Sequence, residues 1–437
     1  MTSANCMSSA DFFAAWKHSL SADFEQDGVP AKSDPWVTQA AKIATSDKAL
    51  VLALSDDSAL LAAAVGHEIH VYEIATSELL HTLRGHTGSK IERLEFQPGG
   101  RKIAAGSSRI ITRQMTYMCR VWDLDALAES GAQDYLDEAV EAAVSAASST
   151  LSQHWSPEDL EAADLQTKFA EIIAGGQVAV DLRNGLVFAG TLPGHGSRAF
   201  SHDGRSLLYI SDRNHAVVLD VATLTERFRL SSHTDAIMWA EMSPDDKVIA
   251  TSSWDKTTRI WSMESGELIH VLEGATNQSW VGAFSPDGAL IASGSGDKII
   301  RIWRVDTGEL MHTLSGFTQW IRSLAFSPDG GHLVAGAAGG TLRVFDVASG
   351  ACEQSWQVDL TDRFARSFIE IDGVRYTARG DLFFRSPEGR VFGYRASDNL
   401  KWESGKVLQY GQFATSKDGS LLVTPLQDHS VCIWKID

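Results

Sequence analysis

Two residues of this chain, His233 and Asp255, have side chains that could work together in catalysis. A histidine oriented by a carboxylate is a common general base that activates a hydroxyl nucleophile. The aspartate, however, recurs along the chain, since Asp297 follows Asp255 by 42 residues in a similar local sequence. A catalytic site is normally built once on a fold, so this periodic recurrence favours a structural role for the pair.

Other candidate sites for chemistry are weak. The sequence lacks Gly-x-x-x-x-Gly-Lys-Ser/Thr, Gly-x-Ser-x-Gly and His-Glu-x-x-His, the motifs of phosphate loops, serine hydrolases and zinc proteases. His67 and His70 fall in a predicted strand and point to opposite faces, so no metal site is expected there. The glycine-rich residues 293–297 fall in a predicted strand and turn. We therefore expect no catalytic residue, no metal and no cofactor.

A four-residue turn sequence repeats along the chain with a spacing of 42 residues. The clearest copies begin at four serines, each with an aspartate two residues later: Ser201, Ser243, Ser285 and Ser327. Weaker copies begin at Ser55, Gln97 and Ser416. Self-similarity at this period indicates one supersecondary unit that is repeated several times.

Each repeat is predicted to contain four short strands. A β-branched run ends in an aromatic residue 18 residues after the turn, as at Trp261, Trp303 and Phe345. A strand of small residues precedes it, a tight Asp-Lys turn separates the two, and a fourth apolar run follows, as at residues 268–272. Four-stranded sheets at this period predict an all-β fold, the β-propeller.

At these residues the chain resembles the WD40 repeat family, over roughly residues 40–437. Trp122-Asp123 is a complete Trp-Asp dipeptide, and Gly85-His86 and Gly194-His195 match the Gly-His pair of the family. The resemblance implies a hydrogen-bonded tetrad of His, Ser/Thr, Asp and Trp within a blade. Four residues match it completely: His233, Thr251, Asp255 and Trp261. Ser293, Asp297 and Trp303 match three of its positions, with Ala275 in place of the histidine.

The third strands indicate how many blades to expect. They end at eight positions: Tyr72, Trp122, Leu219, Trp261, Trp303, Phe345, Phe392 and Trp434. This count predicts eight four-stranded blades, and seven, the common number in the family, is the alternative. The chain ends directly after the last third strand, so a fourth strand must come from elsewhere or a sheet edge stays open. Residues 36–43 precede the first unit and are predicted to fill that place.

Composition limits the compartment and the kind of partner. The formal charge of −18 and the pI of about 5.2 argue against the basic surface that nucleic-acid binding needs. The four cysteines are scattered without a Cys-x-x-Cys pair, which is typical of a reducing compartment. We see no leader-like N-terminus and no long apolar stretch. A cytoplasmic or nuclear protein without direct nucleic-acid or membrane partners is expected.

Two segments are predicted to lie outside the regular repeat of the propeller, which spans residues 36–437. Residues 1–35 form an N-terminal extension, in which residues 9–20 read as a short amphipathic helix. Residues 125–185 are predicted to be a helical insertion between the third and fourth strands of the second blade. Residues 124–176 carry eleven Asp or Glu and one Lys. The insertion is either a solvated helical hairpin or a docking element for a basic partner.

A group of aromatic residues is the candidate binding surface. In the family, partners commonly dock on the face that holds the loops between blades and the turns between second and third strands. The resemblance places six residues near that face: Trp254, Trp280, Trp320, Arg322, Gln278 and Met238. Trp and Arg are enriched at binding hot spots, whereas packing between blades is the alternative role for any one tryptophan. Together they could stack on a cation, a methylated side chain or a proline-containing peptide.

The function that these observations favour is a non-catalytic scaffold, a rigid propeller that presents loop faces to protein partners within a complex. One alternative is a reader of a modified or proline- or arginine-containing peptide through the tryptophan-rich face. A second alternative, from another class, is an enzyme with a pocket at the mouth of the central channel. The lack of an acid, base or nucleophile outside the repeat argues against the enzyme.

Overall fold

The structure is a computed structural model of the 437-residue chain. It describes residues 36–84, 86, 90–111, 114–125, 186–189, 192–193, 198–211, 213–223, 225–357, 371, 373–385, 391–395, 400–404 and 411–437. The helix predicted at residues 9–20 and the helical insertion predicted at residues 125–185, Asp125 excepted, lie outside these ranges. The chain divides into two compact units, Thr45–Leu192 with Ala199–Ser231, and Met1–Ala44 with Pro193–Arg198 and Ser232–Asp437.

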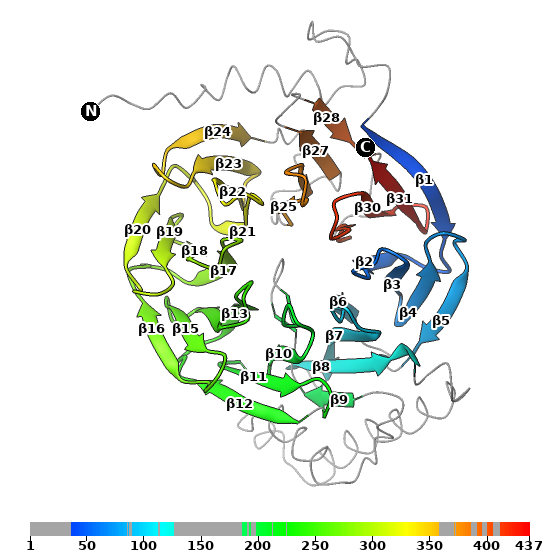
Figure 1. Cartoon of the computed structure of the whole chain (residues 1–437), viewed down its shortest axis with the longest axis horizontal. Coiled ribbons are helices and arrows are strands. Elements are labelled where there is room, and N and C mark those ends of the chain that lie inside the picture. The colour runs from blue at the N-terminus through cyan, green and yellow to red at the C-terminus, as the bar shows by residue number, and fades with distance from the viewer. Residues whose placement is uncertain are drawn as a thin grey trace, which may run out of the picture. The chain divides into compact units, whose positions relative to one another are not determined.

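The first unit contains three antiparallel sheets, which are blades one to three (Figure 1). Blade one comprises β2 (Ala49–Leu54), β3 (Leu60–Val65), β4 (Glu68–Glu73) and β5 (Leu79–Leu83). Blade two comprises β6 (Lys90–Phe96), β7 (Lys102–Ile111), β8 (Gln114–Asp123) and β9 (Leu186–Ala189). Blade three comprises β10 (Ser206–Ile210), β11 (His215–Asp220) and β12 (Glu226–Ser231). In place of a first strand, blade three has an isolated bridge between Phe200 and Leu207.

The second unit contains the other five sheets, each with four strands. Blade four is β13 (Ile237–Met242), β14 (Val248–Ser253), β15 (Thr258–Ser262) and β16 (Leu268–Leu272); blade five is β17 (Ser279–Phe284), β18 (Leu290–Ser295), β19 (Ile300–Arg304) and β20 (Leu310–Leu314). Blade six is β21 (Ile321–Phe326), β22 (His332–Ala337), β23 (Thr341–Asp346) and β24 (Cys352–Gln357); blade seven is β25 (Arg375–Tyr376), β26 (Leu382–Arg385), β27 (Val391–Arg395) and β28 (Leu400–Glu403). Blade eight is β29 (Ala414–Thr415), β30 (Leu421–Leu426), β31 (Ser430–Ile436) and β1 (Val37–Ala44). The prediction of an all-β, eight-bladed propeller is confirmed, and the alternative of seven blades is wrong.

The predicted completion of the last sheet by the start of the propeller is also confirmed. β1 pairs antiparallel with β31, from Val37 opposite Ile436 to Ala44 opposite Ser430 (Figure 1). The Asp437 N–H donates to the Trp36 carbonyl over 2.9 Å and extends the ladder to the last residue. The open edge that β31 would otherwise present is therefore paired within the chain.

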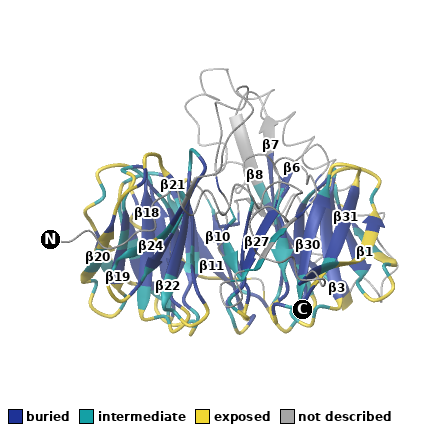
Figure 2. Cartoon of the chain, turned by 90° about the horizontal axis from the view of Figure 1, so that it is seen from above, coloured by how far each residue is buried: buried dark blue, intermediate teal, exposed yellow. Residues whose placement is uncertain are grey.

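The repeated turn has one geometry wherever the serine and aspartate are present. In the copy at Ser243, the serine hydroxyl donates to the Asp245 carboxylate over 2.7 Å and accepts the Val248 N–H over 3.1 Å. The fourth residue has a left-handed backbone, with φ of +71° at Gly288 and at Gly330, which is the reason for glycine there. These turns lie at the exposed ends of strands whose residues are mostly buried (Figure 2).

Blade seven departs from the repeat in its first turn, which the sequence did not reveal. The turn runs from Thr377 to Gly380, and the Thr377 N–H donates to the carbonyl of Asp381, four residues later. In blade six the Ser327 N–H reaches the carbonyl of His332, five residues later. The turn of blade seven is therefore one residue shorter than the others.

This shortening moves the aromatic position of the third strand. Leu382 pairs with Tyr394 in blade seven, as Leu333 pairs with Phe345 in blade six. Tyr394 therefore occupies the position that the sequence assigned to Phe392, two residues earlier. Tyr394, and not Phe392, is the side chain of β27 that is equivalent to the repeated tryptophan.

Candidate functional site

The three predicted tryptophans and Arg322 form one continuous cluster in the structure. The Trp280 and Trp320 rings are stacked, with centroids 5.7 Å apart and planes inclined by 16°. Trp254 meets the other side of this pair edge-on, 5.3 Å from the Trp280 centroid at 62°. The Arg322 guanidinium carbon lies 4.7 Å from the Trp280 ring centroid, within cation–π range. We call these four residues the tryptophan surface.

Backbone irregularities place these side chains at the strand ends. The first-strand ladders of three consecutive blades skip one residue each, at Met238, Trp280 and Arg322. A β-bulge leaves its extra residue unpaired and changes the direction of its side chain. The same irregularity, repeated every 42 residues, brings Trp280 and Arg322 to the same end of neighbouring sheets. Met238 occupies the equivalent bulge of blade four.

The other two tryptophans come from the loops that border these bulges. The Trp254 N–H donates to the Ala236 carbonyl over 2.8 Å, which fixes the turn after β14 beside the entrance to β13. The equivalent bond in blade five runs from Gly296 to Gln278 and in blade six from Ala338 to Trp320, both over 2.8 Å. Gln278 is thus held at the equivalent position to Trp320, one blade earlier.

A glycine makes room for this stacking. A Cβ atom on Gly296, the blade-five equivalent of Trp254, would lie 3.4 Å from the Trp280 indole nitrogen and 3.2 Å from the Asn277 side chain. A side chain at this position would therefore lie against the central ring and Asn277.

Exposure differs across the cluster. The Trp320 side chain is exposed, at 42% of its full accessible surface, whereas Trp254, Trp280 and Arg322 are half-buried. The inner rings therefore support an outer ring that solvent reaches. An exposed aromatic group held rigidly by its neighbours is suited to bind a partner, because little side-chain freedom remains to be lost.

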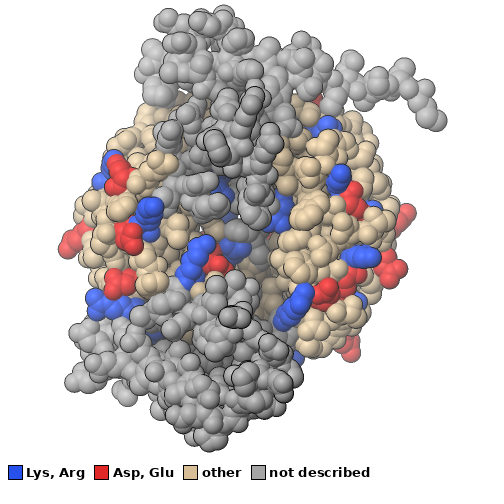
Figure 3. Space-filling model, turned by 180° about the vertical axis from the view of Figure 1, so that it is seen from behind, with Lys and Arg blue, Asp and Glu red and all other residues tan. Residues whose placement is uncertain are grey.

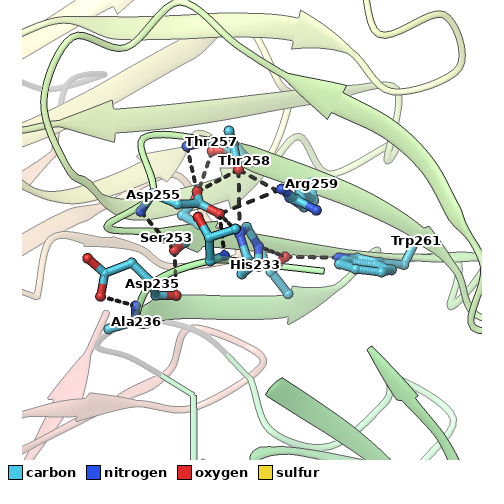
Figure 4. A network of polar contacts seen from close by, with 12 residues as sticks. His233, Asp235, Ala236, Ser253, Asp255, Thr257, Thr258, Arg259 and Trp261 are labelled. Atoms are coloured by element: carbon cyan, nitrogen blue, oxygen red, sulfur yellow. Dashed lines mark hydrogen bonds and ion pairs between the residues drawn. The ribbon is translucent and has the colours of Figure 1, made fainter. Parts of the chain in front are cut away.

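The second predicted group, His233, Thr251, Asp255 and Trp261, forms a closed hydrogen-bonded network (Figure 4). The His233 ring joins Asp255 Oδ2 through Nδ1 and Thr251 Oγ1 through Nε2, each over 2.7 Å. The Trp261 indole N–H donates to the same threonine oxygen over 2.9 Å. Every polar atom that would be needed for catalysis is therefore occupied by another side chain of the blade.

The electrostatics of this network favour a fixed role. Burial alone would raise the pKa of Asp255, but hydrogen bonds with His233 and Thr257 outweigh it and hold that pKa well below its usual range. Burial lowers the pKa of His233, and the bond with Asp255 opposes this only in part. The His233 side chain has no exposed surface. The network joins strands and turns of blade four, which favours a structural role for these residues.

Incomplete versions of the network recur in other blades. The Trp303 indole donates to Ser293 over 3.3 Å, and Trp434 donates to Thr424 over 2.8 Å. Without a histidine, Asp297 lies closer to its arginine, 3.0 Å from the Arg301 guanidinium, than Asp255 does to Arg259, at 3.6 Å. In blade two, His86 Nδ1 lies 2.7 Å from the Ser107 hydroxyl, an arrangement that the repeat alone did not predict.

The described residues offer little for other kinds of site. No group of three or more His, Cys, Asp or Glu side chains that could hold a metal ion occurs among the described residues. Within the same residues, no helix has the length and apolar character needed to cross a membrane. On the face shown in Figure 3, the acidic and basic side chains that are drawn in colour are interspersed, without a continuous basic patch.

Comparison with known proteins agrees with the repeat. The family model described as "WD domain, G-beta repeat" matches residues 77–123, 224–262, 266–304 and 308–346. The chain is also similar to "Autophagy-related protein 16" of Arabidopsis thaliana, with 25% identity over 237 residues. That match covers 52% of this chain and 42% of the plant protein, so the chain spans less than half the length of this relative. The chain therefore contains WD40 repeats in at least four of its blades.

Proposed function

We propose that this WD40-repeat propeller is a non-catalytic protein-interaction scaffold within a complex, and that the tryptophan surface is one of its docking sites. Propellers built from these repeats generally act through protein partners. The observation that carries the proposal is Trp320, an exposed ring fixed by stacking on Trp280. Such a ring contributes contact area without the entropy loss of a mobile side chain.

The arrangement of the tryptophan surface limits which of its rings a partner side chain can contact. Arg322 already occupies a cation–π position on Trp280, so that ring is not the open one. The accessible ring is Trp320, to which an aromatic, proline or arginine side chain could stack. Recognition of a modified or proline- or arginine-containing peptide is therefore a second candidate function. An array of such peptides, probed with the wild-type chain and with Trp320→Ala, distinguishes it from docking of a folded partner.

Three further expectations belong with this proposal. The acidic segment around residues 125–185 is a second docking element for a basic partner. The similarity to a plant protein named for autophagy makes that process the first in which to look for partners. The cytoplasm or nucleus is the expected compartment, in keeping with Cys119, Cys352 and Cys432, which are free thiols in the described part of the chain.

The test is affinity capture with the intact chain, read by quantitative mass spectrometry. Trp320→Ala should deplete a specific set of partners by about tenfold or more, the scale of a binding hot spot. Leu310→Ala is the matched control, because Leu310 is equally exposed, at 43%, but lies on β20, outside the tryptophan surface. Equal capture by all three proteins would refute docking at this surface. Turnover in a broad substrate panel would instead support an enzyme.

A further inference from the structure

A cavity of about 460 Å³ lies between blades six and seven, away from the tryptophan surface. It is bordered by the first turns of both blades, which join first and second strands, whereas the tryptophan surface lies at the opposite strand ends. Its polar lining includes Asp329, His332, Glu353, Tyr376, Arg379 and Tyr394. The volume lies within the range that binds small molecules or single side chains. We call it the seam cavity.

Comparison with the neighbouring blade shows what distinguishes this lining. His332 and Glu353 stand where blade five has Leu290 and Met311, each 42 residues earlier. In the cavity they lie side by side, with His332 Nε2 3.2 Å from Glu353 Oε2. Packing between blades needs only apolar residues at these positions, as blade five demonstrates. Blade three also has polar residues at these positions, Ser206 and Arg227, with the Arg227 guanidinium bonded to the Ser206 hydroxyl over 2.9 Å. The carboxylate of Glu353 distinguishes blade six from blades three and five and points to a ligand in this seam.

Blade seven contributes a second departure of the same kind. Tyr376 pairs with Leu382 as Phe326 pairs with Leu333 in blade six, so the tyrosine adds a hydroxyl at an aromatic position. Burial raises the pKa of Tyr376, and the charges of Asp329 and Glu353 raise it further, so the phenol stays neutral. No group in the described part of the chain hydrogen-bonds its hydroxyl. The cavity thus holds a phenol that can still accept or donate.

The carboxylates of the seam cavity favour a positively charged ligand. Asp329 Oδ1 accepts the Ser327 hydroxyl over 2.5 Å and the Gly331 N–H over 3.0 Å, and these bonds lower the pKa of Asp329. Its second oxygen takes no part in these turn bonds. Asp329 and Glu353 therefore provide two carboxylates beside two tyrosine rings, and Glu353 also faces the His332 ring.

The arginine of the lining is bonded toward blade eight and keeps its positive charge. Arg379 donates from Nη1 to the Ile436 carbonyl over 3.0 Å. Hydrogen bonds from Ser416 and Ser420, with a smaller contribution from Arg379, lower the pKa of Asp418 to about 2. The Arg379 guanidinium is thus committed to blade eight.

We propose that the seam cavity binds one cationic side chain, arginine or lysine, of a peptide partner. The carboxylates of Asp329 and Glu353 pair with the cationic head, and the rings of Tyr376 and Tyr394 contact its aliphatic stem and the face of the cation. The Tyr376 hydroxyl accepts a further N–H. This site is separate from the tryptophan surface and stands whether or not that surface binds a partner.

The test measures binding of N-acetyl-arginine methylamide to the intact chain by saturation-transfer NMR, beside its neutral citrulline counterpart. The arginine probe should bind with a dissociation constant on the order of millimolar, and the citrulline probe about tenfold more weakly. Asp329→Asn should weaken the arginine probe about tenfold, and Tyr376→Phe several-fold, since phenylalanine is the residue of the equivalent position in blade six.

The repeat supplies the matched control. Asp287 forms the same turn in blade five, accepting the Ser285 hydroxyl over 2.5 Å, but it does not line the seam cavity. Asp287→Asn and Trp320→Ala should therefore leave binding of the arginine probe unchanged. The proposal would be overturned if both probes bound equally or if neither showed saturable binding. It would also be overturned if Asp287→Asn lost as much binding as Asp329→Asn, or if only Trp320→Ala lost binding. The last outcome would assign the cation to the tryptophan surface.

Discussion

Trp280 and Trp320 stack at 5.7 Å although each is fixed in a different blade, one in a bulge of β17 and the other in the loop before β21. The two residues hold different positions of the repeat, so their contact depends on both the bulge and the spacing of adjacent sheets. A stack of this kind reports on the alignment of blades five and six. It also means that the exposed ring is supported from beneath.

Replacing Trp320 by alanine should change folding stability little, by less than about 1 kcal/mol, because its side chain is already exposed. Replacing Trp239, which is 1% exposed and whose ring would lie 2.5 Å from a Cβ on Gly282, should cost about 3–5 kcal/mol. Urea unfolding followed by tryptophan fluorescence measures both. If partner capture is retained while stability falls in Trp320→Ala, the residue packs between blades and does not form a docking surface.

The network in blade four should be more sensitive than its incomplete equivalents. Thr251→Val removes the hydroxyl that bonds both the His233 Nε2 and the Trp261 indole N–H in a buried site. Each unsatisfied group costs about 1–3 kcal/mol, so we expect a loss of about 2 kcal/mol or more in unfolding free energy.

Ser293→Ala is the matched comparison, because Ser293 serves a single, longer bond from Trp303. It should cost about 1 kcal/mol or less. Equal losses in the two variants would show that the histidine adds nothing to the network, and that its place in blade four has another cause.

Much of this fold follows from sequence period alone. Eight third strands and the pairing of residues 36–43 with the last strand could be predicted, because turn residues recur at fixed spacing and an unpaired edge needs a partner. Blade seven could be counted but not aligned. Its turn has Arg379 where the other blades have an acid or glycine, and it lacks one residue. The sequence therefore assigned the aromatic position of the third strand to Phe392 and not to Tyr394.

The residues of the tryptophan surface could be predicted from the sequence, but their geometry could not. Alignment of the repeats placed Trp254, Trp280, Trp320 and Arg322 near one face. The bulges that direct Trp280 and Arg322 depend on how two strands pair, a relationship with no local sequence signal. The seam cavity was not foreseen, because it depends on the spacing between two sheets, although Leu290 to His332 is a change that comparison of repeats could have flagged.

His86 should make stability depend on pH. Burial, with smaller contributions from the Arg120 and His67 charges, lowers the pKa of His86 to about 3. Below about pH 6.5, the ordinary histidine pKa, His86 is protonated in the unfolded chain but stays neutral in the folded chain. Stability is therefore complete above about pH 6.5 and falls with decreasing pH, by up to about 1.4 kcal/mol per pH unit for this proton.

His86→Asn should flatten this slope between about pH 6.5 and pH 5, where carboxylates titrate little. Urea unfolding at several pH values measures it. His429→Asn is the control, because His429 is exposed and is not among the charges that act on His86, so its loss should leave the slope as in wild type. An unchanged slope in His86→Asn would mean that this histidine is protonated in the folded chain.

Removing residues 126–184 and bridging the gap with a short Gly/Ser linker should leave the propeller folded. The flanking strands β8 and β9 are neighbours in one sheet, with Val121 opposite Leu186, so the linker only has to close a hairpin. Circular dichroism and thermal melting measure the outcome. An insoluble variant, or one with less β-sheet signal, would make these residues part of the core and weaken their proposed role in docking.

Finally, the two ends of the propeller should be joinable by a disulfide in one register only. Thr38 and Lys435 face each other in the β1–β31 ladder, and Cα atoms of opposed residues lie about 4.5–5.5 Å apart, within disulfide reach. Thr38→Cys combined with Lys435→Cys should lose two free thiols on mild oxidation and raise unfolding free energy by about 2–4 kcal/mol. Thr38→Cys combined with Ser430→Cys is the control, since Ser430 pairs with Ala44, about 20 Å along the strand from Thr38. If the control pair crosslinks as readily, β1 is not held in this register and exchanges between several pairing registers on β31.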